Sequence, residues 1–237
     1  NSPMQAGLFE KARFHLAGDR GLLVEYGDGI DPIVNNKVRS MAIVIEQNTL
    51  AGVLEIIPTY RSLLIVYDPS GTSPDHLRKS LDSLEENLKD IRIPPPATVE
   101  IPVCYGGEFG PDIDFVAESH QLAIEEVIRI HSEPEYLIYM VGFTPGFPFL
   151  GGLPDILHTP RLETPRTFVP QGSVGIANGQ TGVYPVASPG GWQLIGRTPV
   201  TLFAPQRPNP FLYQAGDKIK FQPISREDFD RLAGEEA

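Results

Sequence analysis

The distribution of proline divides this chain of 237 residues into two parts with different constraints on folding. Five of the 24 prolines precede residue 94 and nineteen lie from that residue onward, while glycine divides seven to sixteen around the same point. Proline fixes φ and has no amide hydrogen, so it is excluded from helix interiors and central strands. The second part must therefore consist of short elements joined by many turns. Residues 93–98 contain three consecutive prolines and predict an extended linker, which gives domains 1–93 and 94–237.

The first part predicts an α+β N-terminal domain built from two ββα units. Asp31 before Pro32 and Ser73 before Pro74 are typical helix starts, because the polar side chain accepts backbone N–H groups and proline suits the first helical position. Apolar residues follow both starts at helical spacing, and the leucines after Ser73 are too few for a coiled-coil seam. The predicted strands cover residues 12–16, 22–26, 53–57 and 63–67. Helices packed on one face of such a sheet form a compact layered domain.

The second part predicts a mainly-β domain. Short apolar stretches alternate with Gly/Pro turns, a pattern that favours a closed or nearly closed barrel. A helical region over 112–131, with a break near 119–121, and a final helix over 225–233 are added to the strands. The predicted strands cover residues 99–104, 136–141, 173–178, 182–187, 192–195, 200–203 and 217–221.

Composition excludes several classes of function. The formal net charge of −11 opposes binding to nucleic acid, which requires clustered Lys and Arg. No apolar run approaches the roughly 18 residues that span a bilayer, and the first residues lack the pattern of a secretory signal. The single cysteine, Cys104, can form no internal disulfide, and no Cys/His spacing resembles a zinc site. We therefore expect a cytoplasmic protein with no metal and with neither nucleic acid nor membrane as a partner.

Familiar catalytic motifs are also missing. The sequence has no Gly-x-x-x-x-Gly-Lys-Ser/Thr phosphate loop, no Gly-x-Ser-x-Gly nucleophile elbow and no His-Glu-x-x-His zinc motif. None of the three methionines stands in a Met-Lys-Met biotin attachment site. Any ATP or carboxyl-carrier chemistry must therefore draw on groups outside these motifs or outside this chain.

The distinctive segments all lie in the second part and are shaped by Gly, Pro and aromatic residues. They cover residues 105–112, 139–154, 159–166, 169–176, 180–185 and 188–199. Together these segments resemble the carboxyltransferase domain subdomain C/D family, also called allophanate hydrolase subunit 1, and the resemblance runs from the first strands to about residue 203. It implies a cyclophilin-like β-barrel for the second domain, a topology that composition alone does not specify.

The resemblance also implies a function that needs other chains. The family includes the B subunit of 5-oxoprolinase, which with the A and C subunits hydrolyses 5-oxoproline to glutamate using ATP. We therefore expect a non-autonomous subunit of an ATP-dependent lactam hydrolase, with ATP acting at the level of the complex and no biotin on this chain. A KipI-like inhibitor of the autophosphorylation of a sensor histidine kinase is the alternative, because one scaffold serves both. Part of a split urea carboxylase/allophanate hydrolase system is a third possibility.

Candidate binding residues for an anionic or lactam substrate occupy these segments. Arg161 and Arg166 flank a proline-stiffened stretch, and guanidinium groups bind carboxylate or phosphate through paired hydrogen bonds; alternatively, each arginine pairs with a nearby acid. Gln180, Thr181 and Tyr184 offer amide and hydroxyl groups that suit the orientation of a small lactam. A core ring with a satisfied hydroxyl is the alternative for Tyr184.

One short loop contains Ser188, Gly190, Gly191 and Trp192. Adjacent glycines let backbone N–H groups approach an anion and form a nest. The loop therefore predicts a wall of the binding site, or else a simple turn in which Trp192 fills a gap in the packing.

No complete catalytic set is visible, and the catalytic residues are left unassigned. His131 closes a predicted helix, where the helix C-terminus favours the protonated imidazole, so it is a candidate acid or base, or only a helix cap. Asp112 is predicted to cap the helix that follows Pro111.

Residues 139–154 combine three phenylalanines with four glycines and three prolines. The glycines permit tight turns and the prolines remove freedom, so we expect Phe143, Phe147 and Phe149 to lie on a rigid surface. Rigidity lowers the entropy lost on docking, and exposed aromatics in such a setting usually mark an interface or a pocket wall. We expect this segment to border the site and to contact the partner subunit.

Overall fold

The structure, a computed structural model, describes residues 7–86, 88 and 95–236. The chain forms two compact units that divide between Pro95 and Pro96, and each has its own buried core. Of the linker predicted over 93–98, residues 93 and 94 lie outside the described part of the chain. Residues 95–97 have no regular secondary structure, and a strand begins at Thr98.

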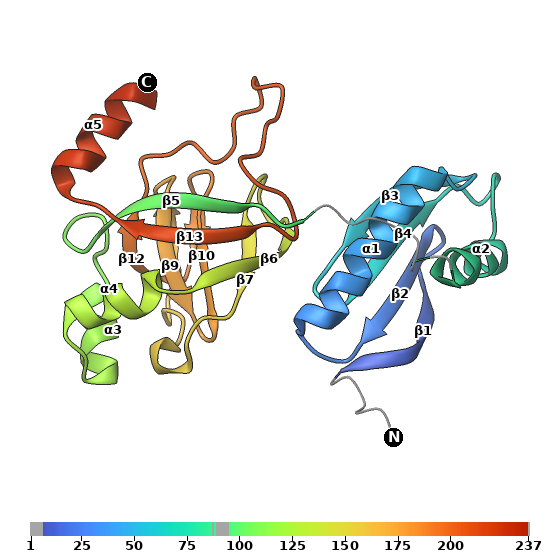
Figure 1. The fold of residues 1–237 in the computed structure, drawn as a ribbon, viewed down its shortest axis with the longest axis horizontal. Coiled ribbons are helices and arrows are strands. Elements are labelled where there is room, and N and C mark those ends of the chain that lie inside the picture. Colours follow the sequence, from blue (N-terminus) through green and yellow to red (C-terminus); the bar gives the residue numbers. More distant parts are fainter. Residues whose placement is uncertain (1–6, 87, 89–94, 237) are drawn as a thin grey trace. The chain divides into compact units, whose positions relative to one another are not determined.

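The first unit is an antiparallel sheet with two helices (Figure 1). Its elements are β1 Leu8–Ala17, β2 Gly21–Gly27, α1 Pro32–Asn48, β3 Val53–Pro58, β4 Ser62–Tyr67 and α2 Pro74–Glu86. The strands are arranged in the order β1-β2-β4-β3, and each neighbouring pair is antiparallel. The two central strands, β2 and β4, therefore supply most of the buried sheet residues.

Both helices of the first unit start where the sequence predicts. Asp31 accepts the Ile33 backbone N–H at 2.7 Å at the start of α1, and Ser73 accepts the His76 N–H at 3.3 Å at the start of α2. Leu77 is 1% exposed and packs with the residues of the sheet and of α1. The leucine stripe of α2 therefore belongs to the core of this unit.

The second unit contains a larger mixed sheet, with helices packed against it. Its elements are β5 Thr98–Tyr105, α3 Ile113–His120, α4 Ile124–Ser132, β6 Glu135–Val141, β7 Pro148–Gly151, η2 Asp155–Leu157, β8 Arg166–Val169, β9 Ser173–Ala177, β10 Gln180–Val183, β11 Ser188–Gly190, β12 Gln193–Arg197, β13 Lys218–Pro223 and α5 Arg226–Glu236. The sheet order is β10-β9-β12-β5-β13-β6-β7, and the end strands β10 and β7 also contact each other. The sheet is therefore a nearly closed barrel, and β8 and β11 form a separate two-stranded sheet.

The first and last strands of this unit lie side by side. β5 and β13 pair in parallel, from Thr98 opposite Lys218 to Val103 opposite Pro223. The Asp217 side chain accepts the Ala97 backbone N–H at 3.1 Å, which adds a bond between segments 120 residues apart in the sequence. The first and last strands of this unit are thus paired in the middle of the sheet order, where β13 joins β5 to β6.

Two predicted strands of the second part are wrong in whole or in part. No strand forms over 200–203, where Phe203 makes only an isolated bridge with Phe211. The strand predicted over 182–187 instead begins at Gln180 and ends at Val183, because Pro185 cannot donate to a ladder. The break within 112–131 falls after His120, where Gln121 adopts a left-handed φ of 55°.

The strands β7, β8 and β11 were not predicted, because each has only three or four residues. β7 begins with Pro148, which is tolerated because this strand lies at the end of the sheet order. Among the helices of residues 7–86, 88 and 95–236, none combines the length and apolar character of a membrane-spanning segment.

Candidate functional site

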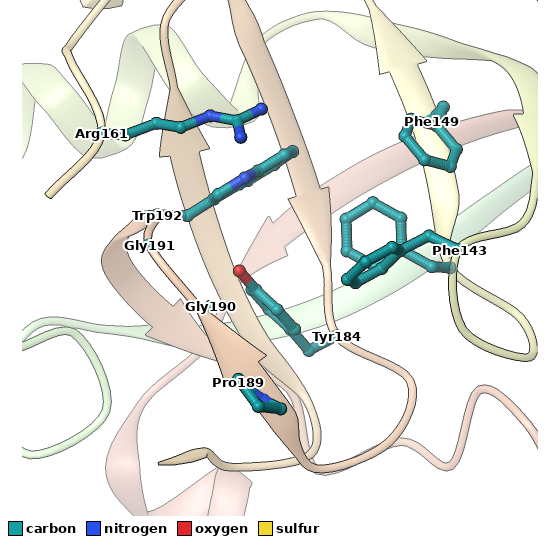
Figure 2. A pocket seen from close by; sticks show the side chains of 9 residues that line it. Phe143, Phe149, Arg161, Tyr184, Pro189, Gly190, Gly191 and Trp192 are labelled. Carbon is teal, nitrogen blue, oxygen red and sulfur yellow. The ribbon is translucent and has the colours of Figure 1, made fainter. Parts of the chain in front are cut away.

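A pocket of about 180 Å³ opens in the second unit (Figure 2). It is lined by Phe143, Phe147, Phe149, Arg161, Tyr184, Pro189, Gly190, Gly191 and Trp192. The structure thus brings together the phenylalanines expected at an interface and several of the residues expected to bind substrate. Pockets for drug-sized ligands are typically about 300–1,000 Å³, so this one suits a single small ring or a site that another molecule completes.

Phe147 forms the centre of the aromatic wall. Its ring lies edge-to-face with those of Phe149, Tyr184 and Trp192, at centroid distances of 5.2, 5.5 and 5.6 Å. Such T-shaped pairs place the positive ring edge on the negative face of a neighbour. Phe147 is only 3% exposed, so of the two expected places, an interface and a pocket wall, the structure places it in the wall of the pocket.

Phe143 lies at the rim and is 75% exposed. Its ring edge contacts Phe147 at a centroid distance of 5.9 Å. Its backbone φ is 68°, in the left-handed region that is costly for a bulky residue. Such strain accumulates at functional sites, and here it holds a large apolar side chain in solvent beside a pocket.

Arg161 contributes the positive charge of the lining. Figure 2 shows its guanidinium beside Trp192, on the side of the pocket opposite Phe143 and Phe149. In the part of the chain that the structure describes, no acidic side chain forms an ion pair with Arg161. The pocket therefore combines apolar walls with a cation that is available to an anionic group.

Tyr184 and Gly190 are fitted to each other. Tyr184 is 2% exposed, and burial raises the pKa of its hydroxyl, opposed by the charge of Arg161 and by the N–H that the Trp192 backbone donates to it. A Cβ on Gly190 would lie 2.4 Å from this hydroxyl, so only glycine fits. Neither Gly190 nor Gly191 has a positive φ, and Gly190 lies in β11. The predicted backbone nest is therefore wrong: the glycine makes room for a ring.

Arg166, also predicted to bind an anion, does not line the pocket. Its Nη2 donates to Asp112 Oδ1 at 2.7 Å, and its Nη1 donates to the Trp192 carbonyl at 3.2 Å. The other Asp112 oxygen accepts the Leu194 N–H at 2.6 Å. With both oxygens engaged here, Asp112 makes no side-chain cap to α3, contrary to the prediction. The pair instead supports the backbone on both sides of Gln193.

Three further predicted binding residues lie outside the lining. Thr181 in β10 is buried and faces the barrel interior, because side chains alternate along a strand and the next position, Gly182, faces Phe147. Gln180 begins β10 and is half-buried. Ser188 begins β11, and its hydroxyl is buried without a hydrogen-bond partner in the part of the chain that the structure describes.

His131 is a core residue, and its proposed role as acid or base is wrong. It is 0% exposed and its ring stacks on Phe221 at 4.8 Å. Thr181 donates its hydroxyl hydrogen to the Gly175 carbonyl at 3.0 Å and accepts from His131 Nε2 at 2.7 Å. His131 Nδ1 therefore accepts from the Tyr105 hydroxyl at 2.8 Å. Burial lowers the pKa of this neutral imidazole to about 3, which outweighs any effect of the helix end.

We expect His131 to make the second unit less stable in acid. The unfolded chain, with an ordinary histidine pKa of 6.5, binds a proton that the folded protein excludes until its pKa of about 3. The free energy of unfolding is therefore unaffected by His131 above pH 6.5. Below that pH it falls, by at most about 1.4 kcal/mol per pH unit, until the pH reaches the pKa of about 3 that His131 has in the folded protein. Denaturation over a pH series tests this, and His131→Gln should flatten the dependence. Equal slopes for the two proteins would contradict it.

Two residues at the site were given no role from the sequence. Pro189 lines the pocket next to Gly190. Gln193 is 3% exposed and donates its side-chain amide to the Pro160 carbonyl at 2.9 Å. The sequence feature that could have indicated Gln193 is its position as a polar residue between Trp192 and Leu194, within an apolar run.

Comparison with known proteins identifies the family of this chain. Residues 12–213 match the model for the carboxyltransferase domain, subdomain C and D. The chain is 47% identical over 228 residues to the B subunit of the 5-oxoprolinase of Bacillus subtilis (strain 168), covering 90% of this chain and 92% of that protein. It is 28% identical over 258 residues to the urea amidolyase of Saccharomyces cerevisiae, covering 95% of this chain and 14% of that protein.

A solved structure agrees with the fold. The crystal structure of TTHA0988 superposes with a TM-score of 0.78 at 37% sequence identity, covering 87% of this chain. This chain spans 40% of the length of that solved chain. Because residues 12–213 match the family model and the chain is 47% identical to the Bacillus protein, the chain belongs to the family of the carboxyltransferase domain, subdomain C and D.

Proposed function

We propose that this chain is the B subunit of an ATP-dependent 5-oxoprolinase, which hydrolyses 5-oxoproline to glutamate together with its A and C subunits. The observation that carries this proposal is the 47% identity to the B subunit of the 5-oxoprolinase of Bacillus subtilis. That identity extends over 90% of this chain and 92% of its relative, which supports the same place in the same kind of assembly. In this proposal, the barrel of the second unit is cyclophilin-like and carries the substrate pocket.

The chemistry of the pocket supports a subunit that acts only with others. Among its lining side chains, polar groups come from Arg161, Tyr184 and Trp192. Hydrolysis of a lactam needs an activated nucleophile and a group that transfers protons, and His131 is sealed in the core. Within the described ranges, no three His, Cys, Asp or Glu side chains are grouped so that they could hold a metal ion. We therefore assign the reactive groups and the ATP to the assembled complex. The proposal also places the complex in the cytoplasm and puts no biotin on this chain.

We assign recognition of 5-oxoproline to the pocket. The substrate carboxylate would pair with Arg161, whose guanidinium offers paired planar donors. The flat ring would lie against the aromatic wall formed by Phe147 and Trp192. The Tyr184 hydroxyl lies beside Gly190 in the pocket lining, and we assign it the role of donor to the lactam carbonyl.

We assign the contact with the C subunit to the rim of the pocket at Phe143 and Phe149. Phe143 is 75% exposed in a strained backbone conformation, and Phe149 is half-buried beside it. A protein that covers this rim would bury apolar surface and exclude water from the pocket. A partner at this rim would therefore complete a pocket that is small and open in the isolated chain.

Reconstitution tests the proposed function. The purified A and C subunits are mixed with 5-oxoproline and ATP, with and without this chain, and glutamate release is measured. We expect glutamate only when this chain is present, and release that is indifferent to it would refute the proposal. An assay of histidine kinase autophosphorylation in parallel would identify the inhibitor alternative, and consumption of urea would identify the third.

A further inference from the structure

The segment that carries Arg161 is attached to the neighbouring strands on both sides of this residue. On the N-terminal side, the Pro160 carbonyl accepts from the Gln193 side-chain amide at 2.9 Å. On the C-terminal side, the Leu162 N–H donates to the Gly191 carbonyl at 2.8 Å. Arg161 is therefore the residue between two attachments, and its side chain is the part of the segment that extends to the pocket.

Gln193 is well placed to control this geometry. It is 3% exposed in β12 and follows directly after Trp192, whose ring forms the pocket wall. A buried amide is costly unless it is hydrogen-bonded, so its bond to Pro160 is strongly favoured. Residue 160 is a proline and has no N–H of its own, so its carbonyl is the group through which its backbone can be held.

The support behind Gln193 is itself rigid. Leu194 is bound through its N–H to Asp112 Oδ2 at 2.6 Å and through its carbonyl to the Asp112 N–H at 2.9 Å. Arg166 donates to the Trp192 carbonyl on the other side. The backbone that carries Gln193 is therefore held in place on both sides. Because the Gln193 amide is bound to the Pro160 carbonyl, it also restricts the position of the next residue, Arg161.

We propose that Gln193 is a positioning residue that holds Arg161 at the pocket and thereby sets the affinity of the pocket for an anion. The identity of the anion, the carboxylate of 5-oxoproline, rests on the proposed function. The placement of Arg161 by Gln193 does not, and it can be measured on the isolated chain.

The first test uses Trp192, the single tryptophan of the chain. Its fluorescence is quenched with iodide, an anion that Arg161 attracts, and with acrylamide, which is neutral. We expect Gln193→Met to lower the iodide quenching constant about twofold, towards the value of Arg161→Ala, because a displaced cation no longer concentrates iodide at the indole. The acrylamide constant should be unchanged.

Ser173→Ala is the matched control. Ser173 is 2% exposed and donates to the carbonyl of another proline, Pro170, at 2.7 Å. This variant also removes a buried bond to a proline carbonyl of the barrel, but one that does not hold Arg161. It should leave both quenching constants unchanged. An iodide constant that stays at the wild-type value in Gln193→Met would overturn the proposal; Gln193→Leu is measured in parallel in case the first variant does not fold.

The second test uses the reconstituted complex. We expect Gln193→Met to raise the KM for 5-oxoproline about five- to tenfold and to leave kcat within about twofold, because it weakens the binding of a charge and not the chemical step. In an Arg161→Ala background the same substitution should have no further effect, since Gln193 acts through that side chain. An effect of equal size in both backgrounds would mean that Gln193 only stabilises the barrel.

The two tests separate this inference from the proposed function. A changed iodide constant with no dependence of glutamate release on this chain would leave the placement of Arg161 supported and the assigned substrate refuted. An unchanged iodide constant refutes the inference even in a fully active complex.

Discussion

Arg161→Ala is expected to raise the KM of the reconstituted 5-oxoprolinase for 5-oxoproline by about 10- to 100-fold. Hydrogen bonds to a charged group contribute about 1.5–3 kcal/mol each, which corresponds to this range. Arg161 lines the pocket and, within the described part of the chain, forms no ion pair, so its charge is available to the substrate. The measurement is the dependence of the initial rate of glutamate release on 5-oxoproline concentration.

Two other arginine variants make this result specific. Arg161→Lys keeps the charge but loses the planar pair of donors, and it should recover only part of the affinity. Arg129→Ala removes an exposed arginine of α4 that pairs with Glu133 at 3.0 Å, and it should leave KM unchanged. A KM for Arg161→Ala within twofold of the wild-type value would show that the substrate carboxylate does not bind to Arg161 in this pocket.

Phe147→Ala is expected to lower the free energy of unfolding of the second unit by about 3–5 kcal/mol, the usual range for a buried phenylalanine. The ring is 3% exposed and contacts Phe149, Tyr184 and Trp192, so its loss opens a cavity behind the pocket. Chemical denaturation followed by the fluorescence of Trp192 measures this, because that residue lies in the second unit. A change below about 1 kcal/mol would contradict the central place of this ring.

Phe143→Ala is the matched comparison in the same segment. Phe143 is 75% exposed and makes its ring contact with Phe147 alone among the described aromatic pairs. Its removal should change the unfolding free energy by less than about 0.5 kcal/mol, as is usual for exposed positions. The pair of variants therefore separates the stability of the pocket from the proposed contact with a partner, which Phe143→Ala should weaken without unfolding the barrel.

Much of the fold followed from local chemistry in the sequence. The helix starts at Asp31 and Ser73 were predictable because capping depends on a few neighbouring residues. The short strands β7 and β11 were not, because Pro148 and Pro189 are acceptable only at edges that the tertiary structure creates. The apolar residues 200–203 indicated a strand, but in the structure only Phe203 pairs, in an isolated bridge with Phe211.

The candidate site was predictable in its parts and not in its assembly. Segments rich in Gly, Pro and aromatic residues drew attention to Arg161, Tyr184 and Trp192, which line one pocket. The partner of Arg166 is Asp112, 54 residues away in the sequence, and no local pattern indicates such a pair. His131 shows the same limit, because its environment comes from β5, β10 and β13, and their burial of the ring outweighs the helix end.

The parallel pairing of β5 with β13 has a consequence for how the protein is made. Contacts between segments 120 residues apart form slowly, since a long loop must close before they can stabilise the chain. During translation, the sheet therefore lacks the strand that joins β5 to β6 until residue 223 has emerged from the ribosome. Ile219 and Phe221 of β13 belong to the buried core of this unit, so that core can be completed only at the end of synthesis.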